Sequence, residues 1–247
     1  MVMGKTRRID KLYDLYSTPE NKGHSLRKRK APSIPPQSDA ELNRIIDDVY
    51  SRNRILSYSF LMQALTGLRY SDCSQLMFSD FYHNGKMVDS FPVVQQKTFN
   101  ARVTKMQEND KFKDWTEQQI YRRAASKSTV TIYVNESISE LVEMSKIENP
   151  NSEYLFANKH PRSKGFPMDI RNAEYHLKKT ERNLQLNYQL RTHSLRKCFA
   201  VKLVRNKVNL IKIRDLLGHD SIETTNAYLS TIGTELAQAV SELKYSL

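Results

Sequence analysis

The first folded segment is marked by apolar positions that recur at helical spacing. Ser38 and Glu41 form a capping-box pair, and the apolar positions that follow are three or four residues apart (Leu42, Ile45, Ile46 and Val49). A second apolar run predicts a helix over 55–65 that ends at Gly67. The folded unit is therefore expected to begin at Ser38 with two helices.

After Asp80 the pattern changes to the short, β-branched and aromatic runs that are typical of strands. Residues 81–88 predict a hairpin that turns on Asn84 and Gly85. Two further strands are expected at 91–98 and 130–134. The polar, basic stretch 99–127 lies between them, contains the only tryptophan, and is interpreted as an insertion in a sheet hairpin.

The second half of the chain has a helical pattern. Ser137 and Glu140 predict the start of one helix, and the chain from about Met168 onward is expected to be helical, including 209–217, which ends at Gly218. A last helix over 234–245 has an apolar stripe. The predicted class is α+β and mainly α-helical with a small antiparallel sheet, formed by 38–247 behind a short segment 1–37.

Charge divides the chain unevenly. The formal net charge is +12, and residues 1–37 hold nine Lys/Arg against three acids. Four consecutive basic residues precede a proline-rich stretch, which predicts an extended basic linker (Arg27, Lys28, Arg29 and Lys30). Two interpretations remain open: a solubilising tail or localisation signal, and a DNA-binding strap that follows a phosphate backbone.

Composition excludes several classes of protein. Hydrophobic residues make up 39% and charged residues 27%, which fits a folded polar domain, and no apolar run approaches the roughly 18–20 residues of a membrane span. No signal-peptide pattern is present. Cys73 and Cys198 form no CxxC pair, so neither a disulfide scaffold nor a thiolate metal site is expected. These features predict a reduced intracellular protein with no metal and no membrane partner.

Four short segments carry residues suited to phosphate chemistry, and each has an ordinary explanation on its own. Arg69 and Asp72 could form an ordinary surface ion pair, and Lys97 could be an ordinary solvated lysine. The spacing of His193 and Arg196 occurs by chance on many helices. A tyrosine such as Tyr228 is ordinarily a core residue. The segments are 66–72, 95–98, 193–196 and 216–228.

Together, in this order, the four segments resemble the tyrosine recombinase (phage integrase) family, over roughly 38–240. The resemblance is carried by GLRYSD, QQKT, HSLR and LLGHDSIETTNAYL. It implies a tyrosine-recombinase-like catalytic domain with Tyr228 as nucleophile and Asp72 as a support that holds Arg69. It implies the remaining catalytic residues as Arg69, Lys97, His193, Arg196 and His219.

The residue types suit cleavage of a DNA phosphodiester. Guanidinium groups can bind the non-bridging oxygens of the transition state bidentately, and His219 can donate to the same oxygens. His193 is the expected acceptor for the Tyr228 proton, and Lys97 is the expected general acid for the leaving 5′-oxygen. The expected reaction forms a 3′-phosphotyrosyl bond and needs no cofactor, metal ion or ATP; the chain contains no Walker motif.

The resemblance implies a site-specific DNA recombinase that acts in integration, excision, resolution or inversion. The expected partners are double-stranded DNA with specific recombination sites, three further copies in a homotetramer, and an accessory DNA-bending or host protein. The expected location is the cytoplasm, in association with the nucleoid. Two alternatives stay open: a type IB topoisomerase-like enzyme, and a non-enzymatic DNA-binding regulator.

Several features differ from the family pattern. Many members have a separate helical domain before the catalytic one, whereas 37 residues precede Ser38 here; this fits a minimal enzyme, a substituting basic segment, or a truncated chain. Lys97 and Lys127 each precede a threonine or serine, which resembles the segment that holds the catalytic lysine in the family. Lys97 is preferred as the catalytic lysine. Lys197, after Arg196, is expected to contact phosphate or to fill space. The tail 234–247 docks either on its own domain or in trans.

Overall fold

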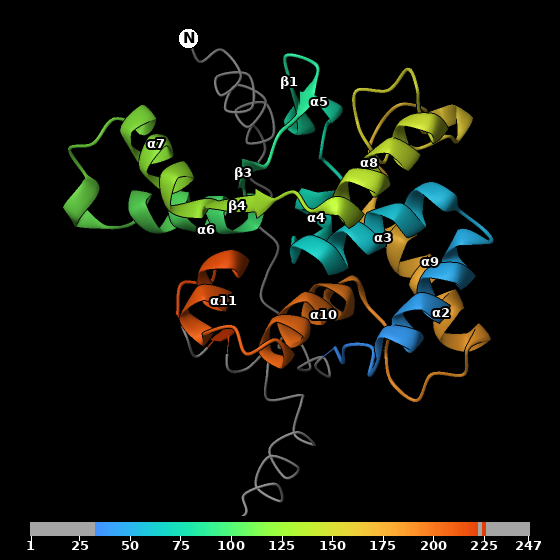
Figure 1. Cartoon of the computed structure of the whole chain (residues 1–247). Coiled ribbons are helices and arrows are strands. Elements are labelled where there is room, and N and C mark those ends of the chain that lie inside the picture. Colours follow the sequence, from blue (N-terminus) through green and yellow to red (C-terminus); the bar gives the residue numbers. More distant parts are fainter. Residues whose placement is uncertain (1–32, 222–223, 226–247) are drawn as a thin grey trace, which may run out of the picture. The chain divides into compact units, whose positions relative to one another are not determined.

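The computed structural model describes residues 33–221 and 224–225 (Figure 1). The predicted nucleophile Tyr228, the basic residues 27–30 and the predicted last helix 234–245 lie outside the described residues. The described helices are α2 (Asp39–Tyr50), α3 (Arg54–Thr66), α4 (Tyr70–Cys73), α5 (Phe78–Phe81), α6 (Gln96–Gln107), α7 (Glu117–Ser128), α8 (Glu136–Glu148), α9 (Ile170–Asn183), α10 (Thr192–Arg205) and α11 (Leu210–Leu217). The strands are β1 (Tyr82–His83), β2 (Lys86–Met87), β3 (Ser90–Val94) and β4 (Thr129–Tyr133). The predicted mainly helical class is confirmed.

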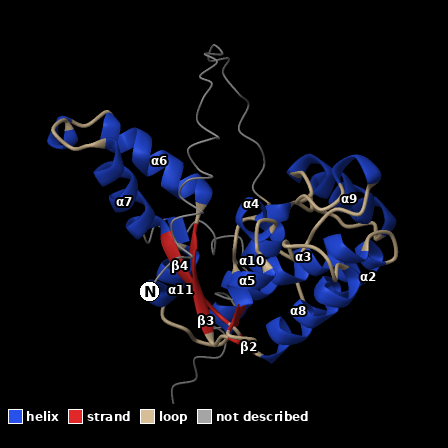
Figure 2. Cartoon of the chain, turned by 90° about the horizontal axis from the view of Figure 1, so that it is seen from above, coloured by secondary structure: helices blue, strands red, loops and turns tan. Residues whose placement is uncertain are grey.

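Helix α3 is the central element of the described fold. It packs against α2, α4, α8 and α10 (Figures 1 and 2), and ten of its thirteen residues are buried, as expected for a helix that is apolar all round. One apolar core joins α3 to the β3–β4 pair and α8, and another joins it to α2, α9 and α10. The predicted helix over 55–65 is thus confirmed, with Gly67 as its left-handed C-cap at φ 67°.

Helix α2 begins where the sequence predicts. The Ser38 hydroxyl accepts the backbone N–H of Glu41 at 3.1 Å. The Glu41 carboxylate, however, accepts the backbone N–H of Gln37 and not that of Ser38, so the helix has one half of the predicted capping box.

The strands form two separate antiparallel pairs. β1 and β2 join through Asn84 (φ 50°) and Gly85 (φ 74°), which confirms the predicted hairpin and its turn residues. β3 and β4 pair in register from Ser90 with Tyr133 to Val94 with Thr129. These two strands are partners although 34 residues lie between the paired residues Val94 and Thr129. That the chain between them is an insertion stays a prediction.

The predicted strand over 91–98 is too long. β3 ends at Val94, and α6 begins at Gln96, because an Asp72 carboxylate oxygen accepts the Gln96 backbone N–H at 2.9 Å. A carboxylate at this position satisfies one of the N–H groups that a helix start leaves without an intrahelical partner. Lys97 therefore lies in the first turn of a helix and not on the predicted strand.

The segment predicted as a polar excursion over 99–127 is a helical hairpin, 96–128, here called the helical insertion. Its helices α6 and α7 pack on each other through the rings of Phe99 and Tyr121, whose centroids are 5.9 Å apart. Val103, Ile120 and Ala124 complete its apolar seam. In both views the helical insertion stands away from α2, α8 and α9 (Figures 1 and 2).

The later helices confirm the predicted pattern with small shifts. α8 begins at Glu136, because Asn135 caps it by accepting the Ile138 N–H at 3.0 Å, and not at Ser137 as predicted. α10 and α11 cover the predicted helical segments, and α11 ends at Gly218 with φ 64°. None of the helices in 33–221 is both long and apolar enough to cross a membrane.

Candidate active site

Helix α10 holds His193 and Arg196, and the Arg196 guanidinium is the largest fully buried side chain of the described residues. Its Nη2 donates to the carbonyl oxygen of Leu217 at 2.7 Å and lies 3.4 Å from Nε2 of His219. Arg196 is therefore buried between α10 and the end of α11.

The C-terminus of α11 is the meeting point of the candidate residues. The Leu217 carbonyl accepts from Arg196 and also from Nε2 of Gln95, at 2.9 Å. Carbonyls in a last helical turn lack intrahelical donors and carry partial negative charge, so this end of α11 stabilises a buried cation. A Cβ at Gly218 would come within 2.8 Å of Val130 Cγ1, so the turn into His219 has no room for a side chain there.

Arg69 reaches the same point from the segment after Gly67. Its Nη1 donates to Oε1 of Gln95 and to Oγ1 of Thr98, the latter at 3.1 Å. The side chain of Gln95 is therefore a bridge: its Oε1 accepts from Arg69, and its Nε2 donates to the Leu217 carbonyl. We call Arg69, Gln95, Arg196 and His219, gathered about the Leu217 carbonyl, the Leu217 cluster.

His219 is held on both sides of its ring. Nδ1 lies 3.0 Å from Oγ1 of Thr225, and Nε2 faces Arg196. Because a guanidinium only donates, this arrangement favours a neutral ring with its proton on Nδ1. Burial, followed by the charges of Arg196 and Arg69, lowers the pKa of His219 to about 4, against the opposing charge of Asp220.

His193 lies at the edge of the cluster. Its side chain is exposed to solvent, but the surrounding protein displaces much of the water near it. Desolvation is the first cause that lowers its pKa, to about 4, and the charges of Arg196, Lys97 and Arg69 add to it. Glu174 of α9 opposes this effect and also accepts the Thr192 N–H at 3.0 Å. Glu174 thus fixes the first turn of α10, on which His193 stands.

The two candidate lysines lie in different surroundings. The exposed Lys97 is one of the three cations that act on His193. Lys127 lies at the end of α7, where its backbone carbonyl accepts from Arg102, whose guanidinium also binds the Asp220 carboxylate. The charge of Lys97 acts on His193, which favours Lys97 over Lys127, but the assignment of the general acid stays a prediction.

Asp72 is placed next to the cluster through a backbone contact. One contact of its carboxylate is with the Gln96 N–H at the start of α6, directly after Gln95. Asp72 therefore fixes the helix turn that carries Gln95 and Thr98, the two partners of Arg69. That Asp72 also holds Arg69 directly stays a prediction.

Lys197 follows Arg196 but is directed elsewhere. Its Nζ donates to the Ser33 carbonyl at 2.7 Å. In the next turn of α10, Lys202 forms an ion pair with Asp39 of α2. Desolvation lowers the pKa of Lys197. In this structure Lys197 anchors the chain that leads into α2.

Sequence reasoning missed the residues that hold the cluster in place. They are Gln95, Thr98, Glu174 and Thr225. Gln95 and Thr98 lie in the QQKT segment and Thr225 in the LLGHDSIETT segment, so proximity to a motif was the available signal. Glu174 lies in no motif, and nothing in the sequence singles it out.

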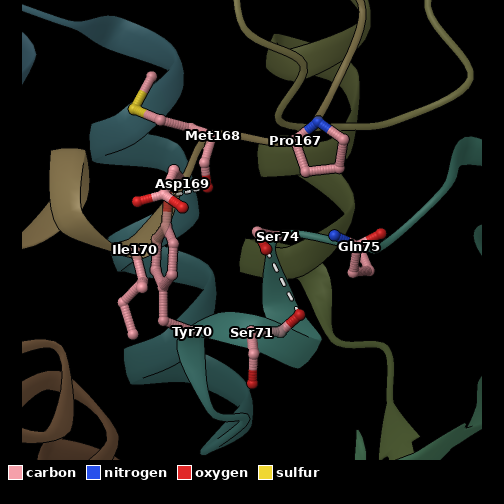
Figure 3. Close-up of a pocket in the computed structure, with 8 residues that line it drawn as sticks. All are labelled: Tyr70, Ser71, Ser74, Gln75, Pro167, Met168, Asp169 and Ile170. Carbon is pink, nitrogen blue, oxygen red and sulfur yellow. Dashed lines mark hydrogen bonds between the residues drawn. The ribbon is translucent and has the colours of Figure 1, made fainter. Parts of the chain in front are cut away.

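A cavity of about 300 Å³ opens next to α4, but none of the candidate catalytic side chains lines it (Figure 3). Tyr70 forms one wall and donates its hydroxyl to the Met168 carbonyl at 3.2 Å. The cavity is therefore separate from the Leu217 cluster. A group of three or more His, Cys, Asp or Glu side chains that would suit a metal ion does not occur among residues 33–221 and 224–225.

The model of the phage integrase family matches residues 38–232. The chain belongs to the phage integrase family. Among relatives of this integrase-family chain, the tyrosine recombinase XerC of Listeria welshimeri serovar 6b is 25% identical over 192 residues, which cover 76% of this chain and 55% of that protein. The chain thus spans about half the length of such curated relatives.

Two solved structures support the fold. The XerA recombinase has a TM-score of 0.56 at 19% identity and covers 90% of this chain and 68% of that one. A lambda integrase tetramer bound to a Holliday junction has a TM-score of 0.56 at 16% identity and covers 81% of this chain and 49% of that one. The integrase-family chain therefore has the catalytic-domain architecture that its motifs predict.

Proposed function

We propose that this integrase-family chain is a site-specific DNA recombinase that cleaves and rejoins DNA through a 3′-phosphotyrosyl bond to Tyr228. The observation that carries the proposal is the Leu217 cluster: Arg196 binds the Leu217 carbonyl and faces His219, and Gln95 links Arg69 to the same carbonyl. His193 and Lys97 lie at its edge. Tyr228 follows Thr225, the partner of His219, by three residues.

The proposed role of the two arginines is to stabilise the transition state. Two guanidiniums can bind the non-bridging oxygens of the phosphate, where negative charge accumulates during the displacement. Their fixed charges supply the stabilisation that a metal ion supplies in other phosphoryl transfers. Arg196 has no exposed surface in this structure, so the groups that cover it must move when phosphate binds, while its bond to the Leu217 carbonyl keeps the guanidinium in place.

The proposed proton transfers balance the reaction. The Tyr228 oxygen bonds to phosphorus and its proton passes to His193, whose lowered pKa keeps the ring neutral and able to accept near neutral pH. The bond to the 5′-oxygen breaks, and that oxygen takes a proton from Lys97. Attack by a 5′-hydroxyl reverses these steps, so the covalent bond conserves the energy and ATP is not required.

The proposed partners are double-stranded DNA with specific recombination sites, and further copies of the chain in a homotetramer. The tetrameric lambda integrase complex supports this assembly by fold similarity. An accessory DNA-bending or host protein and a cytoplasmic, nucleoid-associated location complete the proposal.

Covalent capture of DNA in cells tests the proposed chemistry. We expect the parent chain to form protein–DNA adducts at one repeated sequence and Tyr228→Phe to form none, while both bind DNA equally. Adducts scattered over unrelated sequences would favour a type IB topoisomerase. DNA binding without any adduct would favour a regulator.

The general acid is tested by substituting Lys97→Gln and, as the matched control, Lys127→Gln. We expect Lys97→Gln alone to abolish cleavage of ordinary DNA while DNA binding is retained. A substrate with sulfur in place of the leaving 5′-oxygen needs no general acid, so it should restore cleavage by Lys97→Gln. Failure of that rescue, or loss of cleavage in Lys127→Gln, would contradict the assignment.

A further inference from the structure

The charges of the helical insertion are divided along its length. Its two helices, here called the shaft, contain six cations and a single acid, Glu117. The intervening residues 108–116, here called the tip, contain three acids and two cations. The shaft cations are Lys97, Arg102, Lys105, Arg122, Arg123 and Lys127. The shaft is thus a positive surface, and the tip is slightly negative.

Side-chain contacts of α6 attach the shaft to the candidate active site. Thr98 of α6 binds Arg69, and Arg102 of the same helix binds Asp220, the residue after His219. Arg102 also binds the backbone carbonyl of Lys127 at the end of α7. A phosphate that reaches the Leu217 cluster is therefore close to the start of the shaft.

Several shaft cations remain available for a partner. Lys105, Arg122 and Arg123 are exposed, and within the described residues none of them forms an ion pair. The apolar seam of α6 and α7 explains why these side chains face outward. Clustered cations without acidic partners are typical of surfaces that bind a polyanion.

We propose that the shaft of the helical insertion binds the phosphate backbone of the DNA duplex next to the bond that is cleaved. This inference rests on the proposed function and adds a binding surface to it. Lys105 lies eight residues beyond Lys97, a rise of about 12 Å along a helix, over which one DNA strand presents about three phosphates. The length of the shaft thus matches several phosphate contacts outside the Leu217 cluster.

Salt dependence of DNA binding tests the inference, because each phosphate contact releases counterions. The full chain would be titrated with a fluorescein-labelled duplex of mixed sequence, and Kd would be measured by anisotropy at several salt concentrations. The shaft variant carries Arg122→Gln and Arg123→Gln. The matched control carries Lys111→Gln and Lys113→Gln at the tip, which removes the same net charge from the same hairpin.

We expect the shaft variant to bind roughly tenfold more weakly at physiological salt and to lower the slope of log Kd against log salt by about 1 to 2. The tip control should keep the parent slope and affinity. Equal effects of the two variants would mean that net charge alone acts and would overturn the inference. A shaft variant that keeps the slope but fails to assemble into larger complexes would also overturn it, in favour of contact with a second copy.

The same preparations separate this inference from the proposed function. If the parent forms Tyr228-dependent adducts while the shaft and tip variants share one salt slope, the inference is wrong and the recombinase proposal stands. If the shaft variant loses slope but the parent forms no adduct, the surface binds DNA and the proposed chemistry is wrong. A parent chain that does not bind the duplex would overturn both.

Discussion

The Leu217 cluster and the helical insertion both contain several cations, but these cations differ in burial and in how firmly they are held. In the Leu217 cluster each arginine is fixed by polar groups of the protein, and Arg196 is fully buried. In the helical insertion the cations Lys105, Arg122 and Arg123 are exposed on the surface of two helices. The two regions meet at Gln95 and Thr98, where β3 passes into α6.

This difference fits two separate tasks in the proposed DNA cleavage. A guanidinium that stabilises a transition state must be held in place before the reaction, because reorganising it would raise the barrier. A cation that contributes affinity needs only to neutralise a phosphate and can stay mobile. Substitutions in the Leu217 cluster should therefore change the cleavage rate, and those in the helical insertion should change DNA affinity.

The largest expected effect comes from Arg196→Lys. Lysine keeps the charge but offers no planar fork for the Leu217 carbonyl and a phosphate together, so we expect the cleavage rate to fall about 10²–10³-fold with little change in Kd. Single-turnover adduct formation and anisotropy measure the two quantities. Arg205→Lys, at the exposed end of the same helix, is the control; an equal loss there would remove the distinction.

Gly67→Ala should destabilise the packing under the cluster. A Cβ at Gly67 would collide with Phe199 and lie 3.0 Å from Leu217 Cδ2, in a left-handed conformation that alanine disfavours. We expect the free energy of unfolding in urea to fall by about 2–4 kcal/mol. Gly165→Ala has a similar φ of 85° and nothing within 4 Å, so it should lose only about 1 kcal/mol. Similar losses would refute the packing argument.

Gln95→Leu removes the bridge between Arg69 and the Leu217 carbonyl. We expect the cleavage rate to fall about 10–100-fold while Kd is unchanged, because Gln95 is buried and positions Arg69. The neighbouring Gln96→Leu, which loses only a contact with Asn100, is the control. If Gln95→Leu weakened DNA binding and left the cleavage rate unchanged, Gln95 would contribute to DNA affinity, as the shaft cations are proposed to do.

The smallest expected effect is a loss of stability in mild acid. The pKa of His219 is about 4 in the folded chain and about 6.5 when unfolded, so the unfolded chain binds more protons between these values. The contribution of His219 to the free energy of unfolding is fully present above pH 6.5 and is lost as the pH drops toward 4. We therefore expect Tm to decrease by roughly a few degrees from pH 7 to pH 5. His219→Gln should weaken this dependence without abolishing it, because the pKa of His193 is lowered as well; an unchanged dependence would contradict the prediction.

Local sequence signals predicted much of the fold. The apolar run that forms α3, its end at Gly67 and the turn at Asn84 and Gly85 are each encoded within a few residues, and the structure confirms them. Features fixed by distant contacts escaped prediction. The helical start at Gln96 depends on the Asp72 carboxylate, which lies 24 residues earlier in the chain.

The candidate site divides in the same way. The motifs identified Arg69, His193, Arg196 and His219, which the structure brings together. The burial of Arg196 could not be predicted, because it depends on the end of α11 folding back over α10. The roles of Gln95 and Glu174 depend on which backbone groups they meet, and no pattern of residue types contains that information.

The register of β3 and β4 has a practical consequence. Val94 and Thr129 are paired across the strands, and Gln95 N–H donates to the Ser128 carbonyl at 2.9 Å, so the two ends of the helical insertion are as close as those of a tight turn. Closing a longer loop at fixed ends adds only a slowly growing entropic cost. This junction is therefore a natural grafting point, where a shorter turn or a foreign DNA-reading module of matching end spacing can be exchanged without shifting the strands that frame the Leu217 cluster.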